Sequence, residues 1–264
     1  MDTVVACLKW VTHPGEPHDE RFAGMSSADQ SALEFALVQA AALGVGVTAV
    51  TVGPDAAEKV LRDALACGAR RAIHIRGSGS AQSAEVAAAI AAAVPNAQWV
   101  WCGDYSLDRG TGSVPAFLAA ALGAQQALGI ISVSWQSPGV TATRRLDGGR
   151  RELLAVAAPA VVSVEGATAH LRRAGLAAVR AAAVAEIGGV QPSALGHGDE
   201  AVVRPYRPRS RALAAPTGDD PLDRLRALTD AGAGAATRGE TVILEPVAAA
   251  ARIESALRQW GYLA

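Results

Sequence analysis

The 264-residue sequence is poor in aromatic residues and cysteine, and its charges almost cancel. Aromatic residues make up 4% of it and the net charge is −1, so overall charge gives no reason to expect nucleic acid or an acidic membrane surface as a partner. Cys7, Cys67 and Cys102 form no C-x-x-C pair, which argues against a zinc site and predicts a reducing compartment. We therefore expect a cytoplasmic protein without a bound metal.

Two kinds of targeting or anchoring segment are also missing. No basic region precedes an apolar segment at the start, so no signal peptide is expected. The most apolar stretch, residues 35–52, contains Gln39 and is divided by Gly44 and Gly46. This pattern predicts a helix followed by a buried strand, and no membrane insertion.

Nucleophilic motifs are lacking as well. The sequence has no G-x-S-x-G elbow, and none of its five histidines pairs with another at metal-ligand spacing. His74 falls in an apolar run, where a structural role is the more common one. We expect a chain that is not itself catalytic.

The first half of the chain alternates between short apolar runs and helical periodicity. Ser27 with Gln30 three residues later resembles a capping box at a helix start. This alternation predicts an α/β fold, a Rossmann-like parallel sheet with helices on both faces. Strands are expected at residues 3–8, 47–52, 72–75 and 98–102, and the helices between them at 27–43, 55–66 and 81–94.

Beyond residue 130 the pattern changes. Runs at 130–134, 140–145 and 151–157 predict strands, with Asp147-Gly148-Gly149 as an antiparallel hairpin turn, and further elements are expected at 159–164 and 174–187. Residues 188–264, with short helices near 221–228 and 248–260, have too little apolar periodicity for a core of their own. We expect this C-terminal arm to lie on a partner or on the main domain. Its run Arg204–Arg211 is interleaved with proline, which favours an extended partner-facing segment over a nucleic-acid arm.

The most informative stretch is residues 99–122, which predicts a buried strand, a polar loop, the turn Gly110-Thr111-Gly112-Ser113 and then a helix. Such a turn directs free backbone N–H groups toward the carboxyl end of the strand, where a helix start favours a phosphate. An ordinary loop that binds nothing remains the alternative. Asp104 and Asp108 could flank magnesium, cap the loop or accept ribose hydroxyls; the last two uses are favoured because no P-loop lysine accompanies them.

Several segments in order resemble the β subunit of electron transfer flavoproteins. They are residues 4–11 (VVACLKWV), 25–34 (MSSADQSALE), 50–75, the loop and helix of 101–122, 146–149 and 159–164. They follow one another in the family's order from residue 4 to residue 164. The resemblance implies an adenine-nucleotide-binding domain at 1–187, an arm at 188–264 that packs on the partner subunit, and an electron carrier without catalysis of its own.

The resemblance also implies specific contacts and partners. The nucleotide would be AMP, or FAD in bifurcating members, while a second, redox-active FAD sits mainly in an α subunit that forms a heterodimer with this chain. A flavin-dependent dehydrogenase would supply electrons destined for the respiratory chain. The implied nucleotide contacts are Cys7, Ser26, Ser27, Ala28, Asp29, Val52, Asp108, Arg109, Gly110, Thr111, Gly112, Ser113 and Val114.

One further position would contact the dehydrogenase. By its place in the resemblance Leu176 is the recognition leucine, although a core position in an alanine-rich helix is an equal alternative. The family's N-P-R-Y before this leucine is replaced by residues 169–173 (AHLRR), and its N-P-F-D helix start by Ser26-Ser27-Ala28-Asp29. These departures fit a member dedicated to one pathway, such as recycling of a peptide-derived cofactor of the mycofactocin type. The competing function is a stand-alone adenine-nucleotide regulator akin to universal stress proteins.

Overall fold

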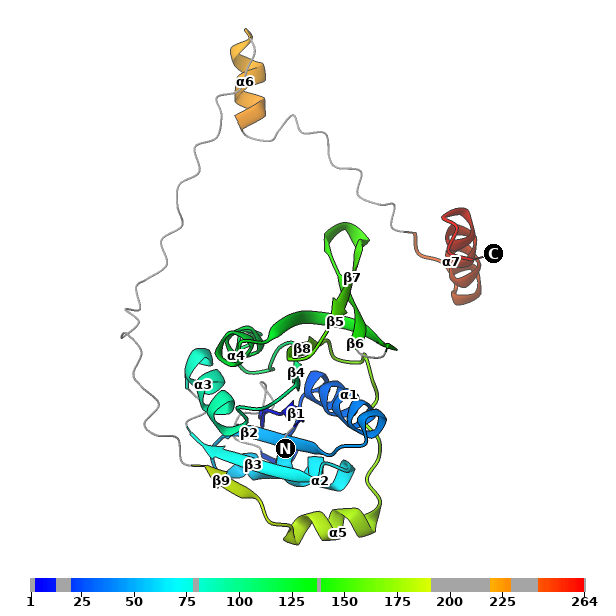
Figure 1. The fold of residues 1–264 in the computed structure, drawn as a ribbon. Coiled ribbons are helices and arrows are strands. Elements are labelled where there is room, and N and C mark those ends of the chain that lie inside the picture. The colour runs from blue at the N-terminus through cyan, green and yellow to red at the C-terminus, as the bar shows by residue number, and fades with distance from the viewer. Residues whose placement is uncertain are drawn as a thin grey trace. The chain divides into compact units, whose positions relative to one another are not determined.

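The computed structural model describes residues 3–12, 20–77, 81–136, 139–190, 219–228 and 242–263. The contacts within the chain divide it into two units, Met1–Ala201 and Val202–Ala264. Figure 1 labels helices and strands of the first unit and the two helices of the second. The basic run Arg204–Arg211, for which an extended conformation is expected, lies outside the described residues.

Among the described residues of the first unit, nine strands form one sheet in the order β7-β6-β5-β8-β4-β1-β2-β3-β9. Every neighbouring pair from β5 to β9 in this order is parallel, and β5-β6-β7 is antiparallel. The predicted α/β architecture with an antiparallel hairpin is therefore confirmed. The strands are β1 (Val4–Cys7), β2 (Val47–Gly53), β3 (Arg71–Arg76), β4 (Trp99–Gly103), β5 (Gln125–Gln136), β6 (Gly139–Arg145), β7 (Arg151–Val156), β8 (Ala160–Val164) and β9 (Gly188–Val190).

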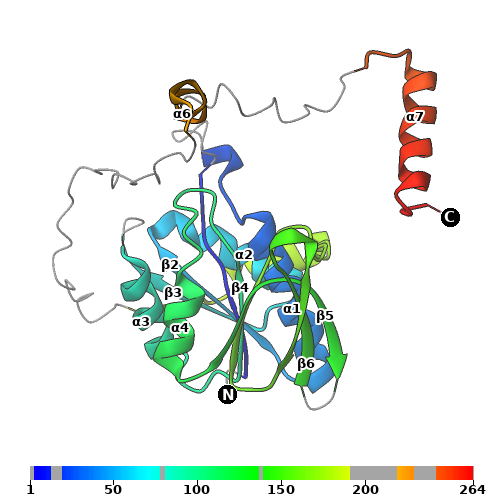
Figure 2. The same ribbon diagram turned by 90° about the horizontal axis from the view of Figure 1, so that it is seen from above.

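Helices cover both faces of the parallel strands (Figure 2). On one face α1 (Ser27–Leu43) and α2 (Glu58–Cys67) bury Leu33 and Leu61 among the strand residues. On the other face α3 (Ser83–Ala93) and α4 (Val114–Leu122) bury Ile90 and Leu118. A further helix, α5 (Leu176–Val184), follows the strands, and Arg62 of α2 donates to the carbonyl of Ala182 at 2.6 Å.

The start of α1 differs from the prediction in one residue. Ser26, with an extended backbone, is the N-cap, and its side chain accepts from the Asp29 N–H at 3.1 Å. Ser27 is already helical, so the expected capping box of Ser27 and Gln30 is wrong. Two adjacent serines offered two registers, and Ser26 has the extended backbone and the side-chain hydrogen bond of an N-cap.

Two strands were difficult to predict because glycine interrupts their pattern. β5 begins at Gln125, five residues before the expected start, and its early part pairs with β8 before a register shift near Gly129. β9 is a three-residue strand containing Gly188 and Gly189, and it pairs with the edge of β3. The sheet thus extends to Val190, two residues past the start expected for the arm.

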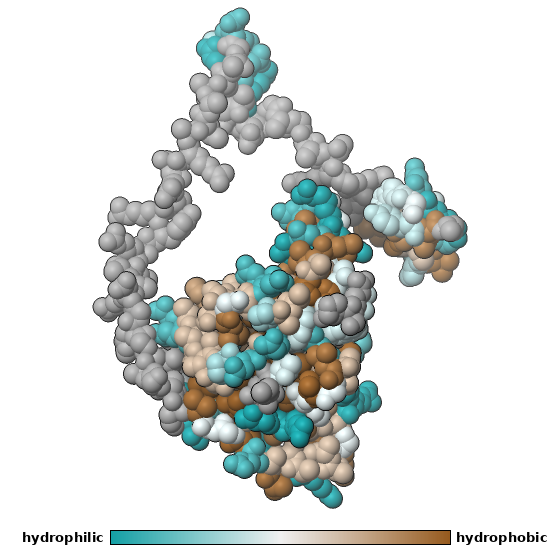
Figure 3. All heavy atoms as spheres, viewed as in Figure 1, coloured by the Kyte–Doolittle hydropathy of each residue, from teal (hydrophilic) through white to brown (hydrophobic). Residues whose placement is uncertain are grey.

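In the second unit the structure describes α6 (Pro221–Leu228) and α7 (Pro246–Gln259), close to the predicted ranges. No residue of α7 is buried, and Val247 and Ile253 are exposed on it. Figure 3 shows that this helix carries both hydrophobic and hydrophilic residues. Across all described segments, no helix has the length and apolar character needed to cross a bilayer.

Candidate functional site

The strand order reverses between β1 and β4. From β1 the chain moves to β2 and β3 on one side, and then returns to place β4 on the other side. Parallel sheets form a crevice at the carboxyl ends of the strands where this reversal occurs, and ligands commonly bind there. A cleft lies at this position, lined by Cys7 at the end of β1, by Leu8 and Lys9 directly after it, and by Cys102 and Gly103 of β4.

The glycine loop between β4 and α4 forms one wall of the cleft. Within the described residues, the backbone N–H groups of residues 110–113 donate no hydrogen bond. Gly112 has φ +56°, and a Cβ there would lie 2.2 Å from the Asp104 carbonyl oxygen, so only glycine fits this turn. Pro115 in the first turn of α4 needs no N–H donor. The loop therefore offers unpaired donors at a helix start, as a phosphate site requires.

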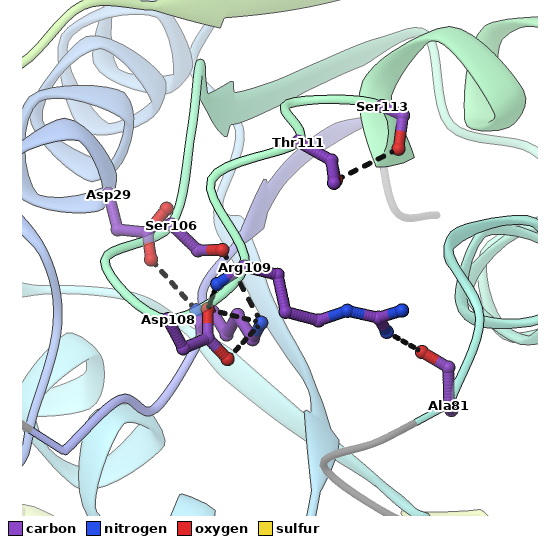
Figure 4. A network of polar contacts seen from close by, with 8 residues as sticks. Asp29, Ala81, Ser106, Asp108, Arg109, Thr111 and Ser113 are labelled. Carbon is purple, nitrogen blue, oxygen red and sulfur yellow. Dashed lines mark hydrogen bonds and ion pairs between the residues drawn. The ribbon is translucent and has the colours of Figure 1, made fainter. Parts of the chain in front are cut away.

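A lysine from outside the loop approaches Asp108, although it does not belong to a P-loop motif. Lys9 Nζ lies 2.8 and 2.6 Å from the two carboxylate oxygens of Asp108 and 3.4 Å from Ser106 Oγ (Figure 4). Partial burial acts to raise the pKa of Asp108, but hydrogen bonds from Lys9 and Ser106 and the charge of Lys9 lower it to about 2. Lys9 was missed because it is 99 residues away in sequence and the sheet alone brings it to the loop.

Asp108 also caps its own loop. Its Oδ1 accepts from the Arg109 N–H at 2.8 Å. Of the uses considered for Asp108, the geometry thus favours loop capping. Asp104 does not line the cleft, and its buried Oδ1 has no hydrogen-bond partner among the described residues. Among the described residues, no three His, Cys, Asp or Glu side chains lie close enough together to hold a metal ion.

Arg109 reaches across the cleft. Its Nη1 donates to the carbonyl of Ala81 at 2.5 Å, so the side chain joins the glycine loop to the segment before α3 (Figure 4). Both Arg109 and Ala81 line the cleft. No local sequence pattern marked Ala81 and Ser83 as site residues, but they follow β3 and line the same cleft as the glycine loop.

Asp29 joins three segments at the bottom of the cleft. Its Oδ2 accepts from the Lys9 N–H at 2.9 Å, and it also accepts a backbone hydrogen bond from Gly103. A Cβ on Gly103 would lie 2.5 Å from Asp29 Oδ1, so glycine is required there. Burial raises the pKa of Asp29 to about 7 against these hydrogen bonds, which lower it. The carboxyl group thus fastens the start of α1 to the ends of β1 and β4.

The opposite side of the cleft is apolar. Val52 at the end of β2 and Val86 and Ile90 of α3 line it. Cys7 and Cys102 lie beside them, both as buried free thiols. Val86 and Ile90 were not among the residues expected at the site, because their periodicity alone indicated only a core-facing helix.

The structure brings most of the expected contact residues to this cleft, but not all. Ser26 is buried beneath it as the helix cap, Ala28 is buried, and Ser27 is exposed beside Gly166. Gly110 lies close to the Ser106 carbonyl, and Asp108 faces Lys9. The expected residues that line the cleft are Cys7, Asp29, Val52, Arg109, Thr111, Gly112, Ser113 and Val114.

Two side chains outside the cleft also answer sequence-based questions. Leu176 begins α5 and is 67% exposed, so the alternative that it is a core residue is wrong. His74 is buried in β3, with Nε2 3.1 Å from the Gly53 carbonyl oxygen, as expected for a structural histidine.

Comparison with known proteins identifies the family. The profile described as "Electron transfer flavoprotein domain" matches residues 19–195. Protein FixA of Rhizobium meliloti is 32% identical over 224 residues, which cover 76% of each chain. The electron transfer flavoprotein subunit beta of Mycobacterium leprae is 35% identical over 123 residues, 45% of this chain and 46% of the relative. That of Dictyostelium discoideum is 29% identical over 146 residues, 53% of this chain and 57% of the relative.

The aligned part thus spans about half the length of the mycobacterial relative, whereas the family profile covers most of the sheet and its helices. The matched residues include α1, the glycine loop and every parallel strand except β1. From this extended match, together with the FixA likeness, the chain belongs to the electron transfer flavoprotein β-subunit family.

Proposed function

We propose that this chain is the β subunit of a heterodimeric electron transfer flavoprotein and that its cleft holds an adenine nucleotide, AMP or FAD. The observation that supports this most is the cleft at the strand reversal. It is lined by the glycine loop, whose N–H groups at residues 110–113 donate no hydrogen bond among the described residues, and by the apolar side chains of Val52, Val86 and Ile90. An adenine nucleotide has the same two parts, an anionic phosphate and a flat apolar base.

Two groups of residues in the cleft fit the two parts of such a ligand. The donors of residues 110–113, with the start of α4, would hold the phosphate. Lys9 and Arg109 lie at the glycine-loop end of the cleft and add positive charge there. Lys9 also binds Asp108 and Arg109 also binds the Ala81 carbonyl, so a phosphate would be a further partner for each. Val52, Val86 and Ile90 would exclude water from the base. The remaining proposed contacts, among them Asp29 and Ser26, act through the backbone segments that they fasten.

The electron-carrying chemistry would come from FAD shared with an α subunit, whereas AMP would serve a structural role. This chain would position the α subunit and would take no chemical part in the electron transfer itself. The exposed apolar residues of α7 suit a helix that packs on another subunit, which agrees with an arm at 188–264 on the α partner. Leu176, exposed at the start of α5, would contact the dehydrogenase that delivers electrons destined for the respiratory chain.

Co-expression with an FAD-bearing α subunit tests this proposal. The expected result is one co-eluting complex with a flavin absorbance spectrum that a matching dehydrogenase reduces. The proposal fails if the chain purifies as a stable single protein that forms no flavin complex. Exchangeable ATP on such a lone chain would instead favour the stand-alone nucleotide regulator.

A further inference from the structure

Two of the three cysteines lie side by side at the bottom of the cleft. Cys7 ends β1 and Cys102 is its register partner on the adjacent parallel strand β4. Side chains of register partners in a parallel pair point to the same face of the sheet. Both indeed belong to the apolar cluster on the α3–α4 face, together with Val5 and Val100 two residues earlier.

The two thiols lie in the same cluster of buried apolar side chains. A hydrogen bond with Cys7, followed by burial, raises the pKa of Cys102 well above its usual value, so that thiol is protonated at neutral pH. Cys7 is 9% and Cys102 is 4% exposed, and both line the cleft. A reagent therefore reaches them through the cleft.

Cys67 provides a natural comparison within the same chain. It ends α2 on the opposite face, and its Sγ lies 3.5 Å from the Arg172 carbonyl oxygen. Because it has no neighbouring cysteine among the described residues, it can act only as a single thiol.

We propose that Cys7 and Cys102 form a dithiol modification site for thiophilic electrophiles that bind two sulfurs at once, with trivalent arsenicals as the matching class. In the reaction each thiol gives its proton to a hydroxyl group on arsenic. Two As–S bonds form, two As–O bonds break, and two water molecules leave, with no change of oxidation state. Neutral thiols therefore suffice, and no oxidant is needed.

The ligand count favours arsenic over a structural metal. Zinc takes four ligands, and the described residues hold no cluster of three or more His, Cys, Asp or Glu side chains. Trivalent arsenic with one organic substituent is satisfied by two sulfurs. An adduct would join the ends of β1 and β4 on the cleft side, where it would occupy space needed by a ligand.

A second part of the inference rests on the proposed function. If the cleft holds an adenine nucleotide, the nucleotide covers both thiols, so the site opens only in the nucleotide-free protein. The dithiol itself does not depend on this, because it follows from strand register and burial alone.

The test is intact-mass analysis of the full chain, stripped of nucleotide and treated with one equivalent of phenylarsine oxide. We expect one adduct per chain and a fall from three to one in the thiols that react after denaturation. Cys7→Ser and Cys102→Ser should each abolish the adduct. The matched variant Cys67→Ser should keep it. The dithiol site is overturned if the adduct survives in either cleft variant. It is also overturned if the folded wild-type chain forms no adduct and all three of its thiols react after denaturation.

Shielding is measured separately by adding AMP or FAD before the arsenical. Slowing of adduct formation by at least tenfold, with no slowing in a denatured sample, supports nucleotide cover. Unchanged rates on a chain that binds the nucleotide contradict the cover. A chain that binds neither nucleotide contradicts the proposed function. Whether that chain forms the arsenical adduct without nucleotide still tests the dithiol site.

Discussion

At the scale of single residues, Asp29 explains why the start of α1 lies against two strand ends. Its carboxyl group accepts a backbone hydrogen bond from Lys9, and a backbone hydrogen bond with Gly103 also acts to lower its pKa. The sequence placed Asp29 at the site through its motif, but could not show that it acts mainly on the protein backbone.

The raised pKa of Asp29 predicts a specific pH dependence. Its folded pKa is about 7 and its ordinary value is 3.8, so between these pH values the folded state binds more protons than the unfolded state. The contribution of Asp29 to the free energy of unfolding should therefore fall as pH rises from 4 to 7, by at most about 1.4 kcal/mol per pH unit.

Urea unfolding of the wild type and Asp29→Asn at several pH values measures this. The difference in unfolding free energy should move in favour of the variant up to pH 7 and then level off. A difference that moves toward the wild type over this interval would show that hydrogen bonding outweighs burial.

The Lys9–Asp108 pair predicts the opposite sign. The folded pKa of Asp108 is lowered to about 2, so its stabilising effect is present above pH 4 and is lost as pH falls toward 2. Both side chains are 35% exposed, and water and salt screen them, so Asp108→Asn should cost less than about 1 kcal/mol at pH 7. Thermal unfolding at low and high salt checks this, with a smaller cost at high salt. A cost that is unaffected by salt would mean that loop capping, not charge, is what Asp108 contributes.

At the scale of elements, the glycine loop and α4 form the part of the cleft that the sequence indicated best. Gly112→Ala places a Cβ 2.2 Å from the Asp104 carbonyl oxygen in a backbone with φ +56°. The loop must then move, so we expect loss of most bound nucleotide and a lower unfolding free energy. Gly148→Ala is the matched control, because Gly148 has φ +72° but open space around it. Strain alone should cost it about 1–2 kcal/mol without loss of nucleotide. Equal nucleotide loss in both variants would remove the loop from the site.

The exposed start of α5 gives a second element-scale prediction. Leu176→Ala should slow electron uptake from the dehydrogenase while changing stability by less than about 0.5 kcal/mol, since the side chain is 67% exposed. Val184→Ala, at the other end of the same helix and 86% exposed, is the control. Stopped-flow reduction of the complex measures the rate. Equal rates in the wild type and Leu176→Ala would leave Leu176 without a part in recognition.

Elements with strong periodicity were predictable, and their partners across the sheet were not. The strand–loop–helix of residues 99–122 and the two helices of the second unit appear where apolar spacing placed them. β9 and the first residues of β5 were missed because glycine and glutamine carry little strand preference, and pairing with β3 and β8 supplies their stability. For the same reason Lys9 and Ala81 could not be assigned to the cleft before the strand order was known.

At the scale of the whole molecule, the chain combines a complete sheet with a segment that has little of its own to pack against. All described strands lie before residue 191, whereas no residue of α7 is buried. A chain ending at Val190 should therefore fold and keep its nucleotide, but should no longer co-purify with the α subunit. Pull-down of a tagged α subunit, with nucleotide content as the folding control, measures both. Full retention of the α subunit by the shortened chain would show that the arm does not hold the heterodimer together.

The central claim is that the cleft at the β1–β4 reversal holds an adenine nucleotide. Its most direct test is mass spectrometry of the small molecules released on denaturing the complex with the α subunit. We predict one adenine nucleotide per β chain in addition to the FAD of the α subunit: AMP in a single-flavin carrier, or a second FAD in a bifurcating one. One FAD per complex with no further nucleotide would contradict the account.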